Sequence, residues 1–145
     1  MSRQQKVKIL VKQPYGEIEE VYVEPSLGSL QDLVGGLIEF VPFPGIKGVD
    51  IMLNEEGKIH GMKGNFFIPH YDDCIVGPAV ILAHDRNKDK YLDLTDTQIK
   101  KVKDYIKTFQ LEEGQELYRD YHVLRPIIKT RQKAFDKQSK EAQAA

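Results

Sequence analysis

The chain has 145 residues, of which 41% are hydrophobic and 30% are charged, and its formal net charge is −1. This composition predicts one globular domain with a real core, and the near-zero charge argues against a general nucleic-acid-binding protein. The single cysteine, Cys74, excludes an intrachain disulfide and fits a reducing compartment. The sequence has neither a signal-peptide pattern nor a long apolar run, so we expect a cytoplasmic protein without a membrane partner.

The first predicted element is a β-hairpin. Apolar and polar residues alternate in 7–11 and in 18–23, and a Pro-Tyr-Gly-Glu turn separates the two runs. A helix of about two turns follows. Ser29 is expected to cap its first turn, and Gly35 with Gly36 is expected to end it in the left-handed conformation.

The middle of the chain predicts further strands. Residues 37–41 and 49–53 are two of them, and 54–57 form a turn into 58–60 that predicts a second hairpin. Residues 65–68 predict a short edge strand.

The most apolar stretch, 74–82, is expected to be a central strand. Gly77 and Pro78 within it indicate a bulge, or a strand that starts at Pro78, because proline cannot donate to a ladder.

The C-terminal part predicts helices. Thr95 and Gln98 form a capping box, and apolar residues recur at helical spacing from Ile99 to Phe109. Leu117, Tyr121 and Leu124 indicate another helix, which Pro126 is expected to break or restart and which is expected to fray from 138 onward. The predicted fold is therefore α+β: a mainly antiparallel sheet with one short helix after the first hairpin and C-terminal helices. We expect an α+β domain over 1–110 and a helical extension over 111–145.

No recognisable catalytic motif occurs in the sequence. Cys74 opens an apolar strand, where desolvation raises the pKa of a thiol and makes it unreactive. His70, Asp72 and Asp73 lie close together, but their spacing matches no standard metal motif, and a turn capped by an aspartate explains them better. We therefore expect a protein that is not an enzyme, with no metal and no cofactor.

The segment 57–64 is rich in glycine and in basic residues, a composition that could bind a phosphate through backbone amides and ammonium groups. A plain hairpin explains the same segment. Aromatic residues next to it could stack on a base. The candidate ligand-binding residues are Lys58, His60, Lys63, Asn65, Phe66 and Tyr71.

Four motifs in a fixed order resemble a domain-of-unknown-function family met in bacteriophages and mobile elements (the family 3846 type). They are LQDLVGGLIE at 30–39, NEEGK at 54–58, the Ile75-Val76-Gly77 strand, and LTDTQ at 94–98. The resemblance covers about residues 5–110, and the tail from Leu111 onward departs from it. It implies a small accessory protein of a phage or mobile element, in the cytoplasm of the host cell, and it supplies no catalytic residues.

The leading hypothesis is a non-enzymatic protein that antagonises bacterial host defence by sequestering a small (cyclic) nucleotide signal. The alternative is a protein-binding inhibitor or adaptor that uses Glu17, Glu19, Glu20 and Glu24 of the first hairpin, or the helical tail, to occlude a host defence or replication protein. A phosphodiesterase is the third hypothesis, although the paired histidines that it needs are missing. We expect a homo-oligomer formed through the C-terminal helices and no binding of specific nucleic-acid sequences.

Overall fold

The computed structural model describes residues 5–144. Its main sheet has the strand order β2-β1-β7-β4-β3, with β8 beside β7, and every pairing is antiparallel. The strands are β1 (Val7–Lys12), β2 (Ile18–Val23), β3 (Ile38–Pro42), β4 (Val49–Asn54), β7 (Ala79–Asp85) and β8 (Lys90–Leu92). The strand β7 is central, as its apolar sequence predicts.

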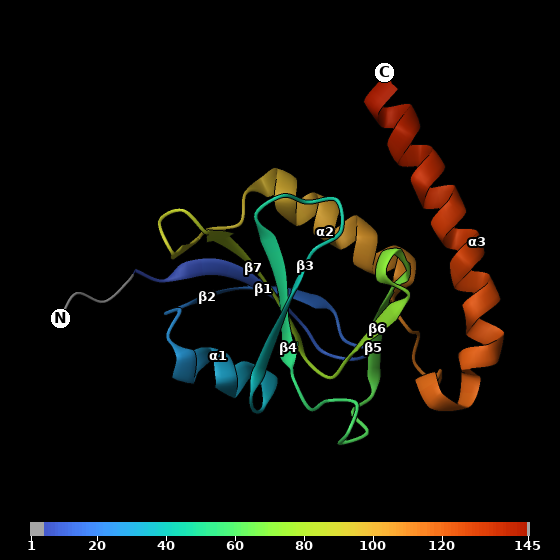
Figure 1. Cartoon of the computed structure of the whole chain (residues 1–145), viewed down its shortest axis with the longest axis horizontal. Helices are drawn as coiled ribbons and strands as arrows, with labels where there is room; N and C mark the ends of the chain where they lie inside the picture. The colour runs from blue at the N-terminus through green and yellow to red at the C-terminus, as the bar shows by residue number, and fades with distance from the viewer. Residues whose placement is uncertain (1–4, 145) are drawn as a thin grey trace.

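A second, two-stranded antiparallel sheet lies beside the first. It consists of β5 (Gly64–Ile68) and β6 (Asp73–Val76), which are joined by the short 3-10 turn η1 (Pro69–Tyr71). The helices are α1 (Leu27–Val34), α2 (Asp96–Phe109) and α3 (Leu117–Ala144). This arrangement confirms the predicted α+β fold, with a short helix after the first hairpin and two C-terminal helices (Figure 1).

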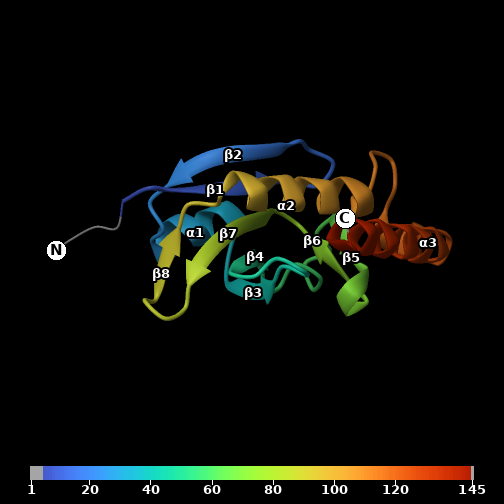
Figure 2. The same ribbon diagram turned by 90° about the horizontal axis from the view of Figure 1, so that it is seen from above.

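The main sheet is covered on both faces. One face packs against α1, whose Leu30 and Val34 lie among apolar side chains of β1, β4 and β7. The opposite face packs against α2, the β5–β6 sheet and the inner side of α3 in one larger cluster. Figure 2 shows α3 at one end of the molecule, outside the β5–β6 sheet. The core therefore reaches from the sheet to α3, and the division into 1–110 and 111–145 stays a prediction.

The N-terminus of α1 differs from the prediction. Ser26, not Ser29, is the N-cap: its side-chain oxygen accepts a hydrogen bond from the backbone N–H of Ser29 at 3.2 Å. The expected cap was wrong because Ser26 and Ser29, three residues apart, could each begin the helix. Ser29 lies inside the first turn. The predicted C-cap is confirmed, since Gly35 is left-handed with φ 77°.

The apolar stretch 74–82 is not one strand. Gly77 is left-handed with φ 73°, and Pro78 follows it without an N–H group, so the chain leaves β6 and enters β7 of the other sheet. The prediction of a new strand start near Pro78 is confirmed, because β7 begins at Ala79.

The predicted second hairpin was wrong as well. Residues 55–61 form successive turns, and β4 pairs with β3 and β7 instead of with a strand at 58–60. Asn54 starts this change of direction. Its side-chain oxygen accepts from the N–H of Glu56 at 2.8 Å, while its amide donates to the carbonyl of Val34 at 3.1 Å.

The capping box of α2 is confirmed, with Thr95 and Gln98 in reciprocal hydrogen bonds. The predicted break at Pro126 was wrong, because α3 runs through it to Ala144. Leu124 and Ile128, on either side of the proline, are both buried in the core and hold the helix together across it. The predicted fraying from 138 is also not seen, and Ala145 lies outside the described residues.

Candidate ligand-binding cleft beside the C-terminal helix

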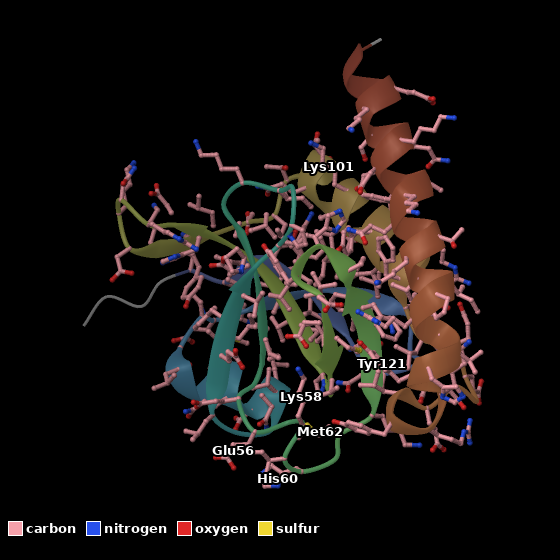
Figure 3. All side chains as sticks on the ribbon, turned by 45° about the vertical axis from the view of Figure 1, so that its right-hand side comes forward. Glu56, Lys58, His60, Met62, Lys101 and Tyr121 are labelled. Atoms are coloured by element: carbon pink, nitrogen blue, oxygen red, sulfur yellow. The ribbon has the colours of Figure 1, made fainter. Side chains whose placement is uncertain are left out.

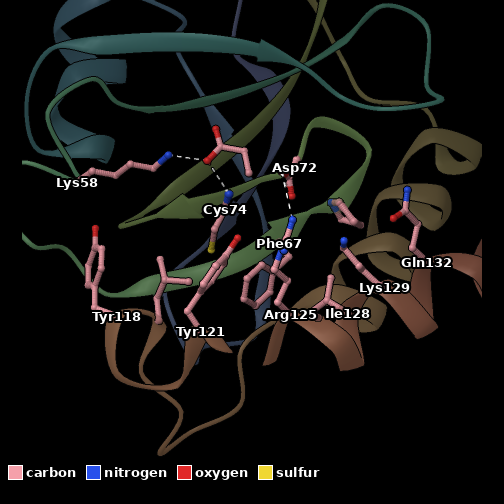
Figure 4. A pocket seen from close by; sticks show the side chains of 13 residues that line it. Lys58, Phe67, Asp72, Cys74, Tyr118, Tyr121, Arg125, Ile128, Lys129 and Gln132 are labelled. Carbon is pink, nitrogen blue, oxygen red and sulfur yellow. Dashed lines mark hydrogen bonds and ion pairs between the residues drawn. The ribbon is translucent and has the colours of Figure 1, made fainter. Parts of the chain in front are cut away.

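A cleft with a volume of about 420 Å³ lies between α3 and the segment that runs from residue 58 to β6. This volume falls within the range of small-ligand sites, about 300–1,000 Å³. One wall comes from α3, and the other comes from Lys58, η1 and the start of β6 (Figure 4). The two walls are more than forty residues apart in the sequence, at 58–74 and 117–132.

The helical spacing of α3 determines which of its side chains reach the cleft. Tyr118, Tyr121, Arg125 and Lys129 follow one another at intervals of three or four residues and therefore share one side of the helix. The neighbouring side of α3 carries Leu117, Leu124 and Ile128, which are buried in the core. This anchoring holds the aromatic and cationic side chains at the cleft.

The floor of the cleft is apolar. Phe67 of β5 and Cys74 of β6 face each other in the strand register, and both are buried. Burial raises the pKa of the Cys74 thiol to about 12, so this thiol is protonated at neutral pH. Cys74 therefore contributes packing to the floor rather than a thiolate nucleophile.

Two ion pairs lie at the cleft, and only the second of them joins its two walls. Lys58 Nζ contacts Asp73 Oδ1 at 2.5 Å, and Arg125 Nη2 lies 3.9 Å from Asp72 Oδ2. The hydrogen bond to Asp73 raises the pKa of Lys58, so its ammonium group stays charged. Asp73 Oδ1 also accepts the backbone N–H of Cys74 at 2.7 Å. Lys129 forms no ion pair with any residue in 5–144.

The six candidate residues from the sequence do not gather at one site. Lys58 lines the cleft, whereas His60 pairs with Glu56 at 3.0 Å on the exposed turn (Figure 3). Lys63 lies over the ring of Tyr15, 5.7 Å from its centroid. These side chains diverge because 55–61 is a run of turns and not a hairpin with one common face.

The other three candidates have structural contacts. Asn65 and Phe66 are each 0% exposed, so neither reaches a ligand at the surface. The Asn65 amide donates to the carbonyls of Lys12 and Gly77, at 2.7 and 2.9 Å. Tyr71 donates its hydroxyl to the carbonyl of Pro42 at 2.9 Å and lies outside the residues that line the cleft.

The histidine of the acidic cluster also has partners of its own. His70 lies 2.8 Å from the Tyr105 hydroxyl through Nδ1 and 2.9 Å from Asp136 Oδ1 through Nε2. It thus joins η1 to both α2 and α3. In the part of the chain that the structure describes, no group of three or more His, Cys, Asp or Glu residues could hold a metal ion.

Sequence reasoning missed the wall of the cleft on α3. A signal was present, because Tyr118, Tyr121, Arg125 and Lys129 repeat at helical spacing next to the buried Leu117 and Leu124. The expected break at Pro126 separated Tyr121 from Lys129 and concealed their common face.

Comparison with known protein families gave a match. A family model described as a domain of unknown function (DUF3846) matches residues 7–110. Neither the curated proteins nor the solved structures gave a significant match. Among the described helices, none is long and apolar enough to cross a membrane.

Proposed function

The chain belongs to the DUF3846 family, and on that premise we propose that it is a non-enzymatic binding protein that holds a small nucleotide in the cleft beside α3. The observation that carries this proposal is the set of side chains on one side of α3, where two tyrosines are followed by Arg125 and Lys129. Aromatic rings stack on bases, and cationic side chains bind phosphate oxygens.

The charges of the cleft fit exchange with an anionic ligand. In the free chain, Asp72 is paired with Arg125 and Asp73 is paired with Lys58. These ion pairs keep both cationic side chains at the cleft. A phosphate group would replace a carboxylate at either cation, and Lys129 would add a charge that no residue in 5–144 neutralises. Figure 4 shows Lys58 and Lys129 toward opposite ends of the cleft, so a ligand could be bound at both ends.

Sequestration fits this chemistry better than turnover. The thiol on the floor is held in its neutral form, and the side chains around it offer charge and stacking. The resemblance to phage and mobile-element proteins supplies the biological context. A protein that removes a cyclic nucleotide signal from the host cytoplasm would antagonise a bacterial defence system.

Isothermal titration with cyclic mononucleotides and cyclic dinucleotides tests the proposal. We expect saturable heat with at least one of them. We expect Lys129→Gln to weaken binding by about tenfold or more, because charge-assisted hydrogen bonds contribute about 1.5–3 kcal/mol. Lys133→Gln removes the same charge from α3 outside the cleft and should leave the affinity unchanged.

Absence of heat with every nucleotide would overturn the proposal, and so would equal losses in the two variants. Recovery of the ligand after denaturation separates sequestration from hydrolysis, since a sequestered nucleotide returns with its mass unchanged.

The second candidate function is a protein-binding inhibitor or adaptor. One observation favours it: β2 is an edge strand of the main sheet, and Glu17, Glu19 and Glu20 are exposed along this edge. An acidic edge would suit a basic host protein. A pull-down from host lysate should then recover one stoichiometric partner, and Glu19→Lys should abolish the recovery.

A further inference from the structure

The side of α3 that faces away from both the core and the cleft carries a stripe of small and apolar residues. Val123, Ile127, Thr130 and Ala134 recur at intervals of four, three and four, the spacing of a seam between two packed helices. Val123 is 54% exposed and Ile127 is 44% exposed. In the part of the chain that the structure describes, this β-branched aliphatic pair stays about half exposed.

Charged residues continue the same stripe at both ends. Asp120 lies three residues before Val123, and Lys137 lies three residues after Ala134. Arg119 and the backbone N–H of Glu116 both bind the Asp120 carboxylate, and they lower its pKa to about 2. One end of the stripe therefore carries a carboxylate that is paired with Arg119 of the same chain, and the other end carries the ammonium group of Lys137.

We propose that a second copy of this chain packs on the stripe, with the two α3 helices antiparallel. A twofold axis between Ile127 and Thr130 places each of these residues opposite the other in the partner copy. Val123 then lies opposite Ala134, so each larger side chain meets a smaller one.

The same axis brings Asp120 of each copy to Lys137 of the other, so that Lys137 joins the Arg119–Asp120 pair at two equivalent places. A parallel arrangement would instead place Asp120 against Asp120 and Lys137 against Lys137. The charges therefore select the antiparallel orientation.

The position of α3 leaves room for this contact. The helix lies at the edge of the molecule in both views, and its C-terminal part extends past the body (Figures 1 and 2). The stretch from 120 to 137 is about 27 Å long at 1.5 Å per residue. Tyr121 and Lys129 lie on another side of the helix, so the cleft stays open in the dimer. The dimer is thus independent of the nucleotide proposal.

Analytical ultracentrifugation of the full chain tests the proposal. We expect a species of twice the 16.6 kDa chain mass. Lys137→Glu places a like charge against Asp120 and should weaken the dimer by at least about tenfold. Asp120→Lys in the same chain should restore it with reversed charges. Lys133→Glu makes the same charge change off the stripe and should leave the dimer intact.

Ile127→Asp buries a charge in the proposed seam and should give a folded monomer, with circular dichroism as the check on folding. This variant and Lys137→Glu change exposed side chains, so they test the contact even if the Asp120 substitution prevents folding. A monomeric wild-type chain at the highest soluble concentration would overturn the proposal. A dimer that survives both Ile127→Asp and Lys137→Glu would overturn it equally.

Discussion

At the scale of single residues, Lys12 and Asn65 form a buried hydrogen bond between a charged and a polar side chain. Lys12 is only 1% exposed, and its ammonium nitrogen donates to Asn65 Oδ1 at 3.1 Å and to the Gln13 carbonyl at 2.8 Å. Asn65 in turn binds the carbonyls of Lys12 and Gly77. These bonds join β1 of the main sheet to β5 and to the end of β6. Desolvation lowers the pKa of Lys12 below 10.5, its ordinary value.

This lowered pKa predicts a particular dependence of stability on pH. Between the folded pKa and 10.5, the unfolded chain keeps the Lys12 proton that the folded chain has lost, so acidification across this window favours unfolding. As the pH rises through the folded pKa toward 10.5, the wild-type free energy of unfolding should increase relative to that of Lys12→Met. Urea unfolding of both chains from pH 7 to pH 10 measures this difference, in which the other titrating groups cancel. A difference that is constant over this range would contradict the prediction.

At the scale of elements, Gly77 decides where β6 ends and β7 begins. Its φ of 73° belongs to the left-handed region, and an added Cβ would lie 2.6 Å from Met62 Sδ. Gly77→Ala therefore combines backbone strain of about 1–2 kcal/mol with displacement of Met62.

Gly114 provides the matched control for this substitution. Its φ is 92°, and an added Cβ there would meet no atom within 4 Å. Gly114→Ala should carry the backbone cost alone, so Gly77→Ala should lower the free energy of unfolding more, as measured by chemical denaturation. Equal losses in the two variants would show that Met62 gives way without cost.

Some features of the helices and strands could be predicted from the sequence, and others could not. The capping box of α2 and the left-handed Gly35 were predictable, because short-range spacing encodes them. The segments 55–61 and 73–85 were not, because β7 pairs with β1 and β4 from far along the chain. Since β3 and β7 flank β4, no edge of β4 remains for a strand at 58–60. The cleft was missed for the same reason: Lys58 was named, but the opposite wall lies on α3, whose continuity past Pro126 depends on packing against the core.

At the scale of the whole molecule, α3 belongs energetically to the core although the family match ends at residue 110. Leu111, Leu117, Leu124 and Ile128 are all buried with side chains of the main body. Burial of each such side chain contributes about 1.5–3 kcal/mol, whereas a whole domain is stable by about 5–15 kcal/mol.

A chain that ends at residue 110 should therefore unfold at a much lower urea concentration than the full chain, or fail to unfold cooperatively. A chain that ends at residue 138 keeps these four side chains and should unfold close to the full-length midpoint. Thermal and urea melts monitored by circular dichroism compare the three chains. A shared midpoint for the shortest and the full chain would show that 1–110 is an autonomous domain.

The central place of β7 has a consequence for how the protein folds during its synthesis. The β1–β2 and β3–β4 hairpins share no hydrogen bond with each other, and β7 pairs with one strand of each. Once residues up to about 70 have left the ribosome, they thus hold two hairpins and α1 but not the complete sheet, since the loops between β7 and its partners must close first. We expect the nascent chain to expose both inner edges, β1 and β4, until residues 79–85 emerge. We therefore expect the pairing of β7 with β1 and β4 to be the slow step of folding.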